Sequence, residues 1–177
     1  MAFIIGGHPR SGTTLLNDLC NSHPDMTVTR EFGNFIPVGR SYKAYRRQML
    51  KRWRRKGLLG EWFLLSPDMA RIDNPPLHKR GMHILQSHVF MLSYLSKMRR
   101  YRRRQFIDVP AIEATLLSMF PNARIVGDKY PGYAFILNRL VKADRLSCLI
   151  IYRDCRDVTS STLKKVRTDW QGRPFAE

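Results

Sequence analysis

The sequence has 177 residues, of which 44% are hydrophobic and 11% aromatic, and its formal net charge is +17 at pH 7. This apolar content excludes a wholly disordered chain and suits one domain with a hydrophobic core. No stretch approaches the roughly 18 to 20 apolar residues that cross a bilayer, and Met1-Ala2 runs into the first predicted strand without a charged leader or hydrophobic signal segment, so the expected location is cytoplasmic.

The first predicted elements are a short apolar strand at 3–6 and a helix at 13–21, joined by a glycine-bearing loop. The loop and the start of the helix read Gly7-His8-Pro9-Arg10-Ser11-Gly12-Thr13-Thr14. A strand that turns into a helix in this way directs backbone N–H groups and the positive helix end at one point, which suits a phosphate or sulfate. The spacing matches the P-loop pattern except that Thr13 replaces the lysine, so Arg10 is the candidate cation.

Further apolar strands are predicted at 124–127 and 147–152, and a short extended segment at 26–28 adds another. They alternate with predicted helices at 110–119, 131–142 and 157–167. This alternation predicts an α/β fold in which helices cover a central parallel sheet. Together with the P-loop-like start, it predicts a three-layer sandwich of the P-loop NTPase type.

The segment 41–105 differs from the rest, because it contains 17 Lys and Arg residues against three acidic ones. Aromatic and apolar residues at helical spacing predict one helix from Tyr42 to Trp53 and a second from Val89 into the arginine-rich run up to Arg104. Loops are predicted between these helices by Pro67, Pro75, Pro76 and Gly81. We therefore expect a single domain over 1–177 with a basic helical insertion at 41–105.

The function of this basic insertion stays open at the level of the sequence. A charge run is often only a solvated face, but aromatic residues interleaved with arginine also suit three kinds of partner. These are an anionic acceptor, an anionic membrane surface and non-specifically bound nucleic acid.

A second segment, 149–161, passes from a predicted strand through Arg153-Asp154-Cys155-Arg156-Asp157 into a helix. With the first loop, it resembles the sulfotransferases that use PAPS (3′-phosphoadenosine-5′-phosphosulfate), and its motif form is most similar to the tyrosylprotein and carbohydrate branch. In that family Pro-Arg-Ser-Gly-Thr-Thr-Leu-Leu is a recurring form of the 5′-phosphosulfate loop. An arginine followed eight residues later by a serine binds the 3′-phosphate there. Arg153 and Ser161 fit this spacing, although Cys155 stands where proline is usual.

The resemblance implies roles for individual residues. The nucleotide would be bound by Arg10, Ser11, Gly12, Thr13, Thr14, Arg153 and Ser161. Glu31 matches the glutamate that is the catalytic base in tyrosylprotein sulfotransferases, so the resemblance assigns it that role. Lys129 lies in an Asp-Lys-x-Pro segment like the one whose lysine touches the transferring sulfate. Arg10 and Lys129 would stabilise charge on the leaving phosphate oxygen.

The implied reaction is transfer of the sulfuryl group from PAPS to the hydroxyl of a saccharide, lipid or tyrosyl acceptor, with release of adenosine 3′,5′-bisphosphate (PAP). No metal is expected, because Cys20, Cys148 and Cys155 form no C-x-x-C pair and no cluster of His, Cys and carboxylates is visible. The expected partner is a hydroxyl-bearing acceptor, with peripheral membrane contact through 41–105 as an option, and nucleic acid is not expected.

Two alternatives remain at this point. One is a P-loop kinase or NTPase with an atypical loop, and the other is a truncated basic protein that binds nucleic acid or membranes without catalysis. Members of the resembled family commonly continue well beyond the 3′-phosphate segment. We therefore expect a carboxyl-terminal part of the domain to be missing after Glu177.

Overall fold

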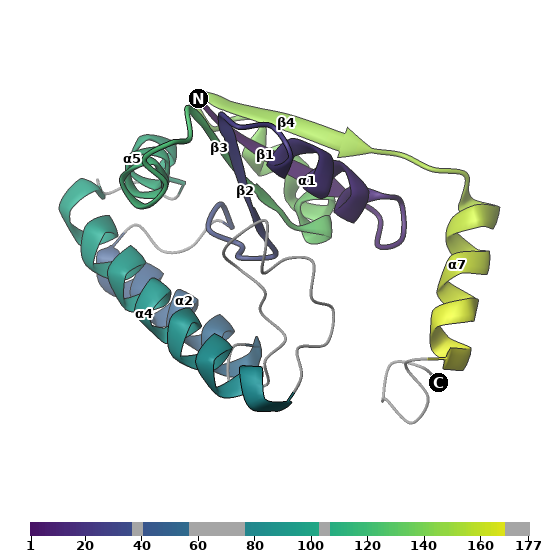
Figure 1. The fold of residues 1–177 in the computed structure, drawn as a ribbon. Helices are drawn as coiled ribbons and strands as arrows, with labels where there is room; N and C mark the ends of the chain where they lie inside the picture. The colour runs from purple at the N-terminus through teal and green to yellow at the C-terminus, as the bar shows by residue number, and fades with distance from the viewer. Residues whose placement is uncertain (37–40, 57–76, 103–106, 169–177) are drawn as a thin grey trace.

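The computed structural model describes residues 1–36, 41–56, 77–102 and 107–168 (Figure 1). In chain order the elements are β1 (Ala2–Gly7), α1 (Thr13–Asn21), β2 (Met26–Arg30), α2 (Tyr42–Lys56), α4 (Leu77–Tyr101), α5 (Val109–Met119), β3 (Ile125–Lys129), the 3-10 helix η1 (Pro131–Ile136), α6 (Leu137–Leu140), β4 (Leu146–Ile151) and α7 (Cys155–Thr168). No helix within these ranges combines the length and the apolar character that a bilayer span requires.

In the described part of the chain, four parallel strands form one sheet in the order β2-β3-β1-β4 (Figure 1). Ile4 of β1 pairs with Asp128 of β3 on one side and with Cys148 of β4 on the other. Because the strands run in the same direction, their carboxyl ends meet at a single edge of the sheet. This arrangement confirms the predicted α/β class with a central parallel sheet.

Side chains of β1 alternate between the two faces of the sheet, as strand geometry requires. Ala2 and Ile4 belong to the larger buried cluster, to which α2, α4 and α5 contribute residues such as Tyr45, Tyr94 and Ile112. Phe3 and Ile5 belong to a smaller cluster on the other face, against which Leu16 and Cys20 of α1 pack. Helices therefore lie on both faces, which gives the three layers that the sequence predicted.

The helices of the predicted insertion, α2 and α4, pack against each other as an antiparallel hairpin (Figure 1). Near one end the Tyr42 hydroxyl donates to the Leu95 carbonyl oxygen at 2.7 Å, and near the other the rings of Trp53 and His88 lie 4.1 Å apart. In the same core the hydroxyl oxygens of Tyr45 and Tyr94 are 2.8 Å apart. The hairpin is thus part of the larger core rather than a separate lobe.

The extent of α4 departs from the sequence prediction. The helix begins at Leu77, well before the predicted start at Val89, and Gly81 lies inside it rather than in a loop. A single glycine costs a helix only about 1 kcal/mol relative to alanine, and the segment contains no proline that would end it. Pro67, Pro75 and Pro76 lie outside the described residues.

The helix predicted at 131–142 is also different, because the structure divides it into η1 and the short α6. Tyr133 of η1 is buried, and its hydroxyl contacts both Asp128 and the Phe35 backbone N–H. These contacts tie η1 to the end of β3.

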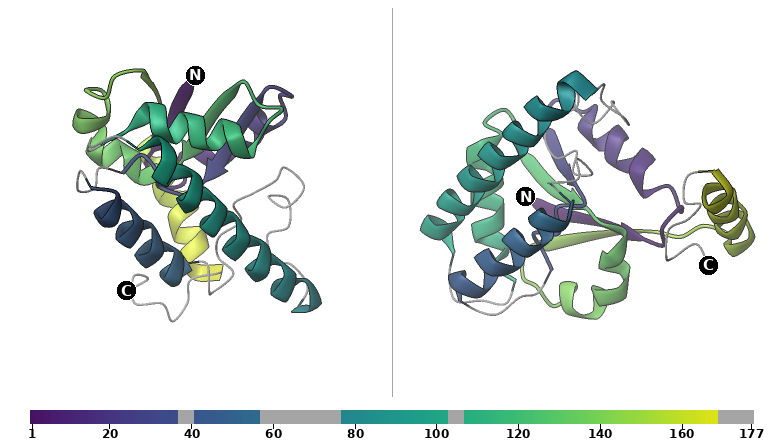
Figure 2. Two further views of the ribbon diagram at one scale, coloured as in Figure 1. Left: turned by 90° about the vertical axis from the view of Figure 1, so that its left-hand side faces the viewer. Right: turned by 90° about the horizontal axis from the view of Figure 1, so that it is seen from below.

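The last described helix, α7, stands apart from the sheet in two views (Figures 1 and 2).

Candidate active site

The carboxyl-terminal edge of the sheet brings together residues that the sequence analysis singled out on separate segments. Glu31 follows β2, Lys129 ends β3, Arg10 lies in the loop after β1, and Arg153 follows β4. Because the sheet order is β2-β3-β1-β4, the edge presents a carboxylate, a lysine, the glycine-bearing loop and an arginine in that order. Parallel α/β sheets commonly bind their ligands at this edge.

The loop between β1 and α1 has the geometry of an anion cradle. Gly12 precedes α1 with φ 103°, and no side chain caps the first N–H groups of the helix. Ser11 Oγ is buried and has no hydrogen-bond partner within the described residues. A Cβ at Gly7 would lie 2.8 Å from Ser11 Oγ and 2.7 Å from the Ile151 carbonyl oxygen, so this position requires glycine. Uncapped N–H groups and an unpaired buried hydroxyl suit an anionic ligand.

The remaining loop residues have different exposures. Thr13 is buried and Thr14 is exposed, so only the second threonine presents its side chain outward. Arg10 is exposed and adopts φ 71°, a left-handed conformation that is uncommon for residues other than glycine.

The two predicted nucleotide-binding segments meet in space. Arg10 Nε donates to Ser161 Oγ at 3.0 Å, and Arg153 Nη1 lies 3.5 Å from the Arg10 carbonyl oxygen. Arg153 also pairs with Asp157 one helical turn later, at 3.4 Å. The segment after β4 is therefore placed directly beside the loop after β1.

Arg156 lies in the same turn but pairs with Asp154, at 3.0 Å between Nη2 and Oδ2. Hydrogen bonds from Arg156 lower the pKa of Asp154 below its usual value. Both side chains are exposed, so their pair stabilises the turn rather than a buried site.

Glu31 and Lys129 form an ion pair, with 3.0 Å between Lys129 Nζ and Glu31 Oε1. The lysine side chain is 2% exposed and the glutamate side chain 36%. Glu31 has φ 59° and its backbone N–H donates to the Lys129 carbonyl oxygen. A carboxylate that solvent reaches, held by a buried ammonium group, can accept a proton while the ammonium stabilises negative charge nearby.

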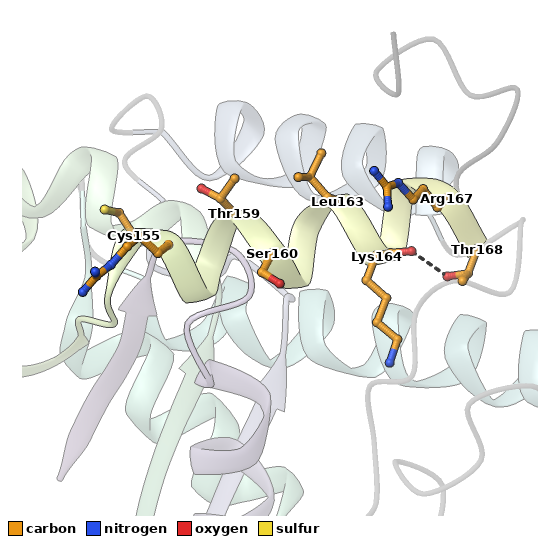
Figure 3. Close-up of a pocket in the computed structure, with 8 residues that line it drawn as sticks. Cys155, Thr159, Ser160, Leu163, Lys164, Arg167 and Thr168 are labelled. Atoms are coloured by element: carbon orange, nitrogen blue, oxygen red, sulfur yellow. Dashed lines mark hydrogen bonds between the residues drawn. The ribbon is translucent and has the colours of Figure 1, made fainter.

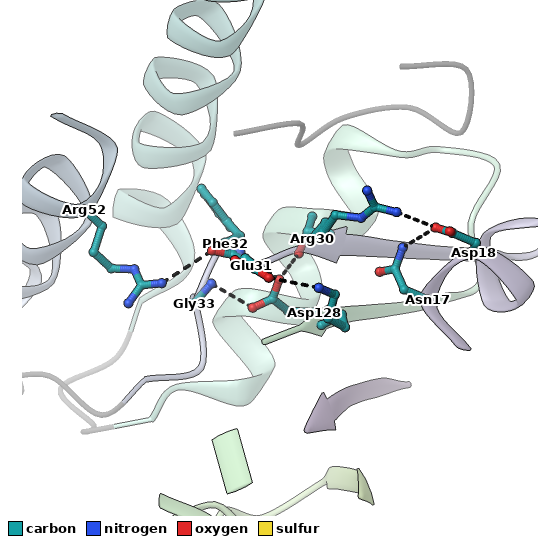
Figure 4. A network of polar contacts seen from close by, with 10 residues as sticks. Asn17, Asp18, Arg30, Glu31, Phe32, Gly33, Arg52 and Asp128 are labelled. Atoms are coloured by element: carbon teal, nitrogen blue, oxygen red, sulfur yellow. Dashed lines mark hydrogen bonds and ion pairs between the residues drawn. The ribbon is translucent and has the colours of Figure 1, made fainter. Parts of the chain in front are cut away.

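Asp128, the residue before Lys129 in β3, is a buried carboxylate that the sequence analysis did not assign to the site (Figure 4). Asp128 is fully buried and accepts four hydrogen bonds, from Thr29 Oγ1, the N–H groups of Phe32 and Gly33, and the Tyr133 hydroxyl. Burial raises the pKa of Asp128 above its usual value, although these hydrogen bonds oppose the shift. The carboxylate therefore fixes the turn that follows Glu31. A charged residue inside a predicted buried strand is the feature of the sequence that could have pointed to this role.

Arg52 of α2 reaches the same turn and was also missed from sequence (Figure 4). Its Nη2 donates to the Glu31 carbonyl oxygen at 3.4 Å, and its guanidinium lies 4.9 Å from the centre of the Tyr130 ring. Gly33 adopts φ 70°, and a Cβ there would lie 2.5 Å from Arg52 Nη2. The basic insertion thus contributes one cation to the turn that carries Glu31.

A separate hollow, lined by residues of α7, lies outside this set of strand ends (Figure 3). Its described lining residues are Cys155, Arg156, Thr159, Ser160, Leu163, Lys164, Arg167 and Thr168. All of these belong to one helix, and none is a residue that the sequence analysis assigned to the site. Within the ranges that the structure describes, no three His, Cys, Asp or Glu side chains come together to hold a metal ion. The candidate active site is therefore the set of strand ends and not this hollow.

Comparison with known proteins identifies a matching protein family. A family model described as "Sulfotransferase family" matches residues 2–174. Comparison with curated proteins and with solved structures found no significant match. The matched range contains the loop after β1, the turn after β2, the end of β3 and the segment after β4. The chain belongs to the sulfotransferase family.

Proposed function

We propose that this protein transfers the sulfuryl group of PAPS to an acceptor hydroxyl and releases PAP. Family membership supports sulfotransfer. The observation that supports the choice of PAPS is the contact between the two segments predicted to bind anions, in which Arg10 Nε lies 3.0 Å from Ser161 Oγ. A nucleotide with a 5′-phosphosulfate and a 3′-phosphate has two separate anionic groups, which suits two adjacent cationic segments.

The residues present fit such a nucleotide. The buried, unpartnered Ser11 Oγ and the uncapped start of α1 suit the 5′-phosphosulfate, with Gly12, Thr13 and Thr14 supplying backbone N–H groups. Arg153 and Ser161 would hold the 3′-phosphate through charge-assisted hydrogen bonds. PAPS, when bound, supplies an activated sulfuryl group whose leaving group is the 5′-phosphate of PAP.

The residues at the ends of β2 and β3 would carry the proton and the charge. Glu31 accepts the proton of the acceptor hydroxyl as the new oxygen–sulfur bond forms and the bond to the 5′-phosphate breaks. Lys129 and Arg10 stabilise the negative charge that develops on the leaving oxygen. The acceptor is a saccharide, lipid or tyrosyl hydroxyl in this proposal.

Two other functions are alternatives that the titration described below distinguishes from sulfotransfer. A kinase or NTPase would prefer ATP, but Thr13 stands where the P-loop lysine would reach the terminal phosphates. A basic protein without catalysis would bind neither nucleotide.

The test is calorimetric titration of the chain with PAP, with ATP and AMP as controls. We expect selective binding of PAP, and we expect Arg153→Ala to weaken it by roughly tenfold to a hundredfold, because a charge-assisted contact is lost. Arg156→Ala is the matched control, since Arg156 lies in the same turn and pairs with Asp154, and PAP affinity should change less than about threefold. Tighter binding of ATP than of PAP, or no binding of PAP, contradicts the proposal.

A further inference from the structure

The hairpin of α2 and α4 has an outer face that the proposed reaction does not use. On α2 the residues Tyr45, Met49 and Trp53 are buried in the core. The opposite side of the helix carries the exposed residues Lys43, Arg46, Arg47, Lys51 and Arg54, which line one groove together with Leu50. The helix has no Asp or Glu in its sequence, so its positive charge is not balanced locally.

On α4 an apolar stripe lies on the side away from the core. Leu85, Val89 and Leu92 are 58%, 60% and 64% exposed and follow one another at intervals of four and three residues, which places them on one helix face. The core-facing side includes Met91, Tyr94, Leu95 and Met98. Exposed Arg99 and Arg100 lie near the end of the helix, which also lacks Asp and Glu.

Both outward sides belong to the same layer, because α2 and α4 pack side by side against the core (Figures 1 and 2). We call this surface the outer face of the hairpin. It combines a row of cations on α2 with a row of large aliphatic side chains on α4.

We propose that the outer face of the hairpin docks on the surface of an anionic lipid bilayer. Lysine and arginine side chains would contact lipid phosphates, while Leu85, Val89 and Leu92 enter the boundary between headgroups and acyl chains. This pairing matches the interfacial mode of binding, in which apolar burial and charge attraction act together.

The aliphatic stripe favours a bilayer over nucleic acid. A nucleic acid backbone would neutralise the cations but would leave these three large aliphatic side chains in water. A bilayer surface removes them from water as well, and contiguous exposed apolar residues commonly mark such interaction sites.

The test measures cosedimentation of the full chain with vesicles of phosphatidylcholine alone and with vesicles that also contain about 30% phosphatidylserine, at roughly 0.15 M salt. We expect partition into the anionic vesicles at least about tenfold above the neutral ones. The variant Arg46→Glu/Arg47→Glu should lower partition by at least about tenfold. Its matched control is Arg139→Glu/Lys142→Glu, two exposed residues beyond the hairpin with the same charge change, which should lower partition less than about threefold.

The apolar contribution is tested separately by Val89→Asn against Val141→Asn, since these valines are 60% and 59% exposed. We expect the first change to lower vesicle partition several-fold, to leave binding of single-stranded RNA unchanged, and the second to affect neither. Thermal unfolding and the PAP titration check that each variant is folded, and they report on the nucleotide site independently of the membrane. Three results overturn the proposal: equal binding to neutral and anionic vesicles, equal loss of partition in the charge variant and its control, or vesicle partition that Val89→Asn does not change.

Discussion

Left-handed backbone conformations mark two of the sequence-predicted site residues. Among the described residues other than glycine, positive φ values occur at Arg10, Glu31 and Arg145. Such conformations cost of order 1 kcal/mol or more and persist where the surroundings hold them. Glu31 is held by its backbone hydrogen bond to Lys129, by the ion pair with the same residue and by Arg52. The position of Glu31, the proposed base, is therefore fixed by two contacts with Lys129 and one with Arg52.

At the residue scale we predict that Glu31→Gln lowers the rate of PAP release from PAPS by roughly a hundredfold or more, because the proton acceptor is lost. The affinity for PAP should change less than about twofold, since Glu31 does not lie in the two segments proposed to bind the nucleotide. Kinetics with a panel of hydroxyl acceptors and calorimetry with PAP measure the two effects.

The same change should also destabilise the fold by roughly 1 to 3 kcal/mol, because it leaves the buried Lys129 ammonium without its counter-charge. Glu31→Gln/Lys129→Met removes that charge as well, so we expect the double variant to regain thermal stability while remaining inactive. An active Glu31→Gln protein would rule out the assignment of Glu31 as the base.

At the scale of elements, Asp128 joins β2, β3 and η1 through its four hydrogen bonds. Its raised pKa means that the folded state holds the proton more readily than the unfolded chain does. Binding of this proton therefore adds to the free energy of unfolding. The contribution is fully present at pH values below the usual aspartate pKa of 3.8, and it is lost as pH rises through the raised pKa of Asp128.

We therefore predict that the stability of wild type relative to Asp128→Asn falls as pH rises from about 4 towards 7. Urea unfolding of both proteins across this range measures the difference. Thr29→Val removes one donor and raises the Asp128 pKa further, so its stability should fall more steeply, whereas Thr29→Ser keeps the donor and should follow wild type. Parallel pH curves for wild type and Asp128→Asn would contradict the pKa shift.

The elements also show what a sequence can predict. The strands and α1 follow from short apolar runs and local turns, which depend on neighbouring residues only. The start of α4 was missed because Leu77–Tyr101 has no acidic first turn to signal it. At the site, the P-loop-like spacing indicated Arg10, and the family resemblance implied Glu31 and Lys129. The contacts of Asp128 and Arg52 could not be predicted, because they involve residues distant in the chain.

At the scale of the whole molecule, the candidate active site at the carboxyl-terminal edge of the sheet and the outer face of the hairpin lie on different parts of one core. Arg52 connects them, because it extends from α2 to the Glu31 backbone while the cations on the opposite side of α2 face outward. If both proposals hold, changes to the outward cations of α2 that keep Arg52 should leave the turn that carries Glu31 in place. The helix α7 also stands apart from the sheet (Figure 1). Contacts among Arg10, Arg153 and Ser161 link the segment that begins this helix to the loop after β1.

This arrangement predicts that PAP slows amide hydrogen exchange both in the loop 8–14 and in α7, because one ligand would hold both segments. At a PAP concentration of about 100 times Kd, binding should stabilise the fold by about 2.7 kcal/mol. Amides of α5 that open only when the whole fold unfolds should slow by this same free energy, so α5 reports the global effect against which the protection of the loop and of α7 is compared. Arg153→Ala should remove the protection of α7, and Arg156→Ala should keep it. Protection of the loop alone would mean that the segment after β4 does not bind the 3′-phosphate.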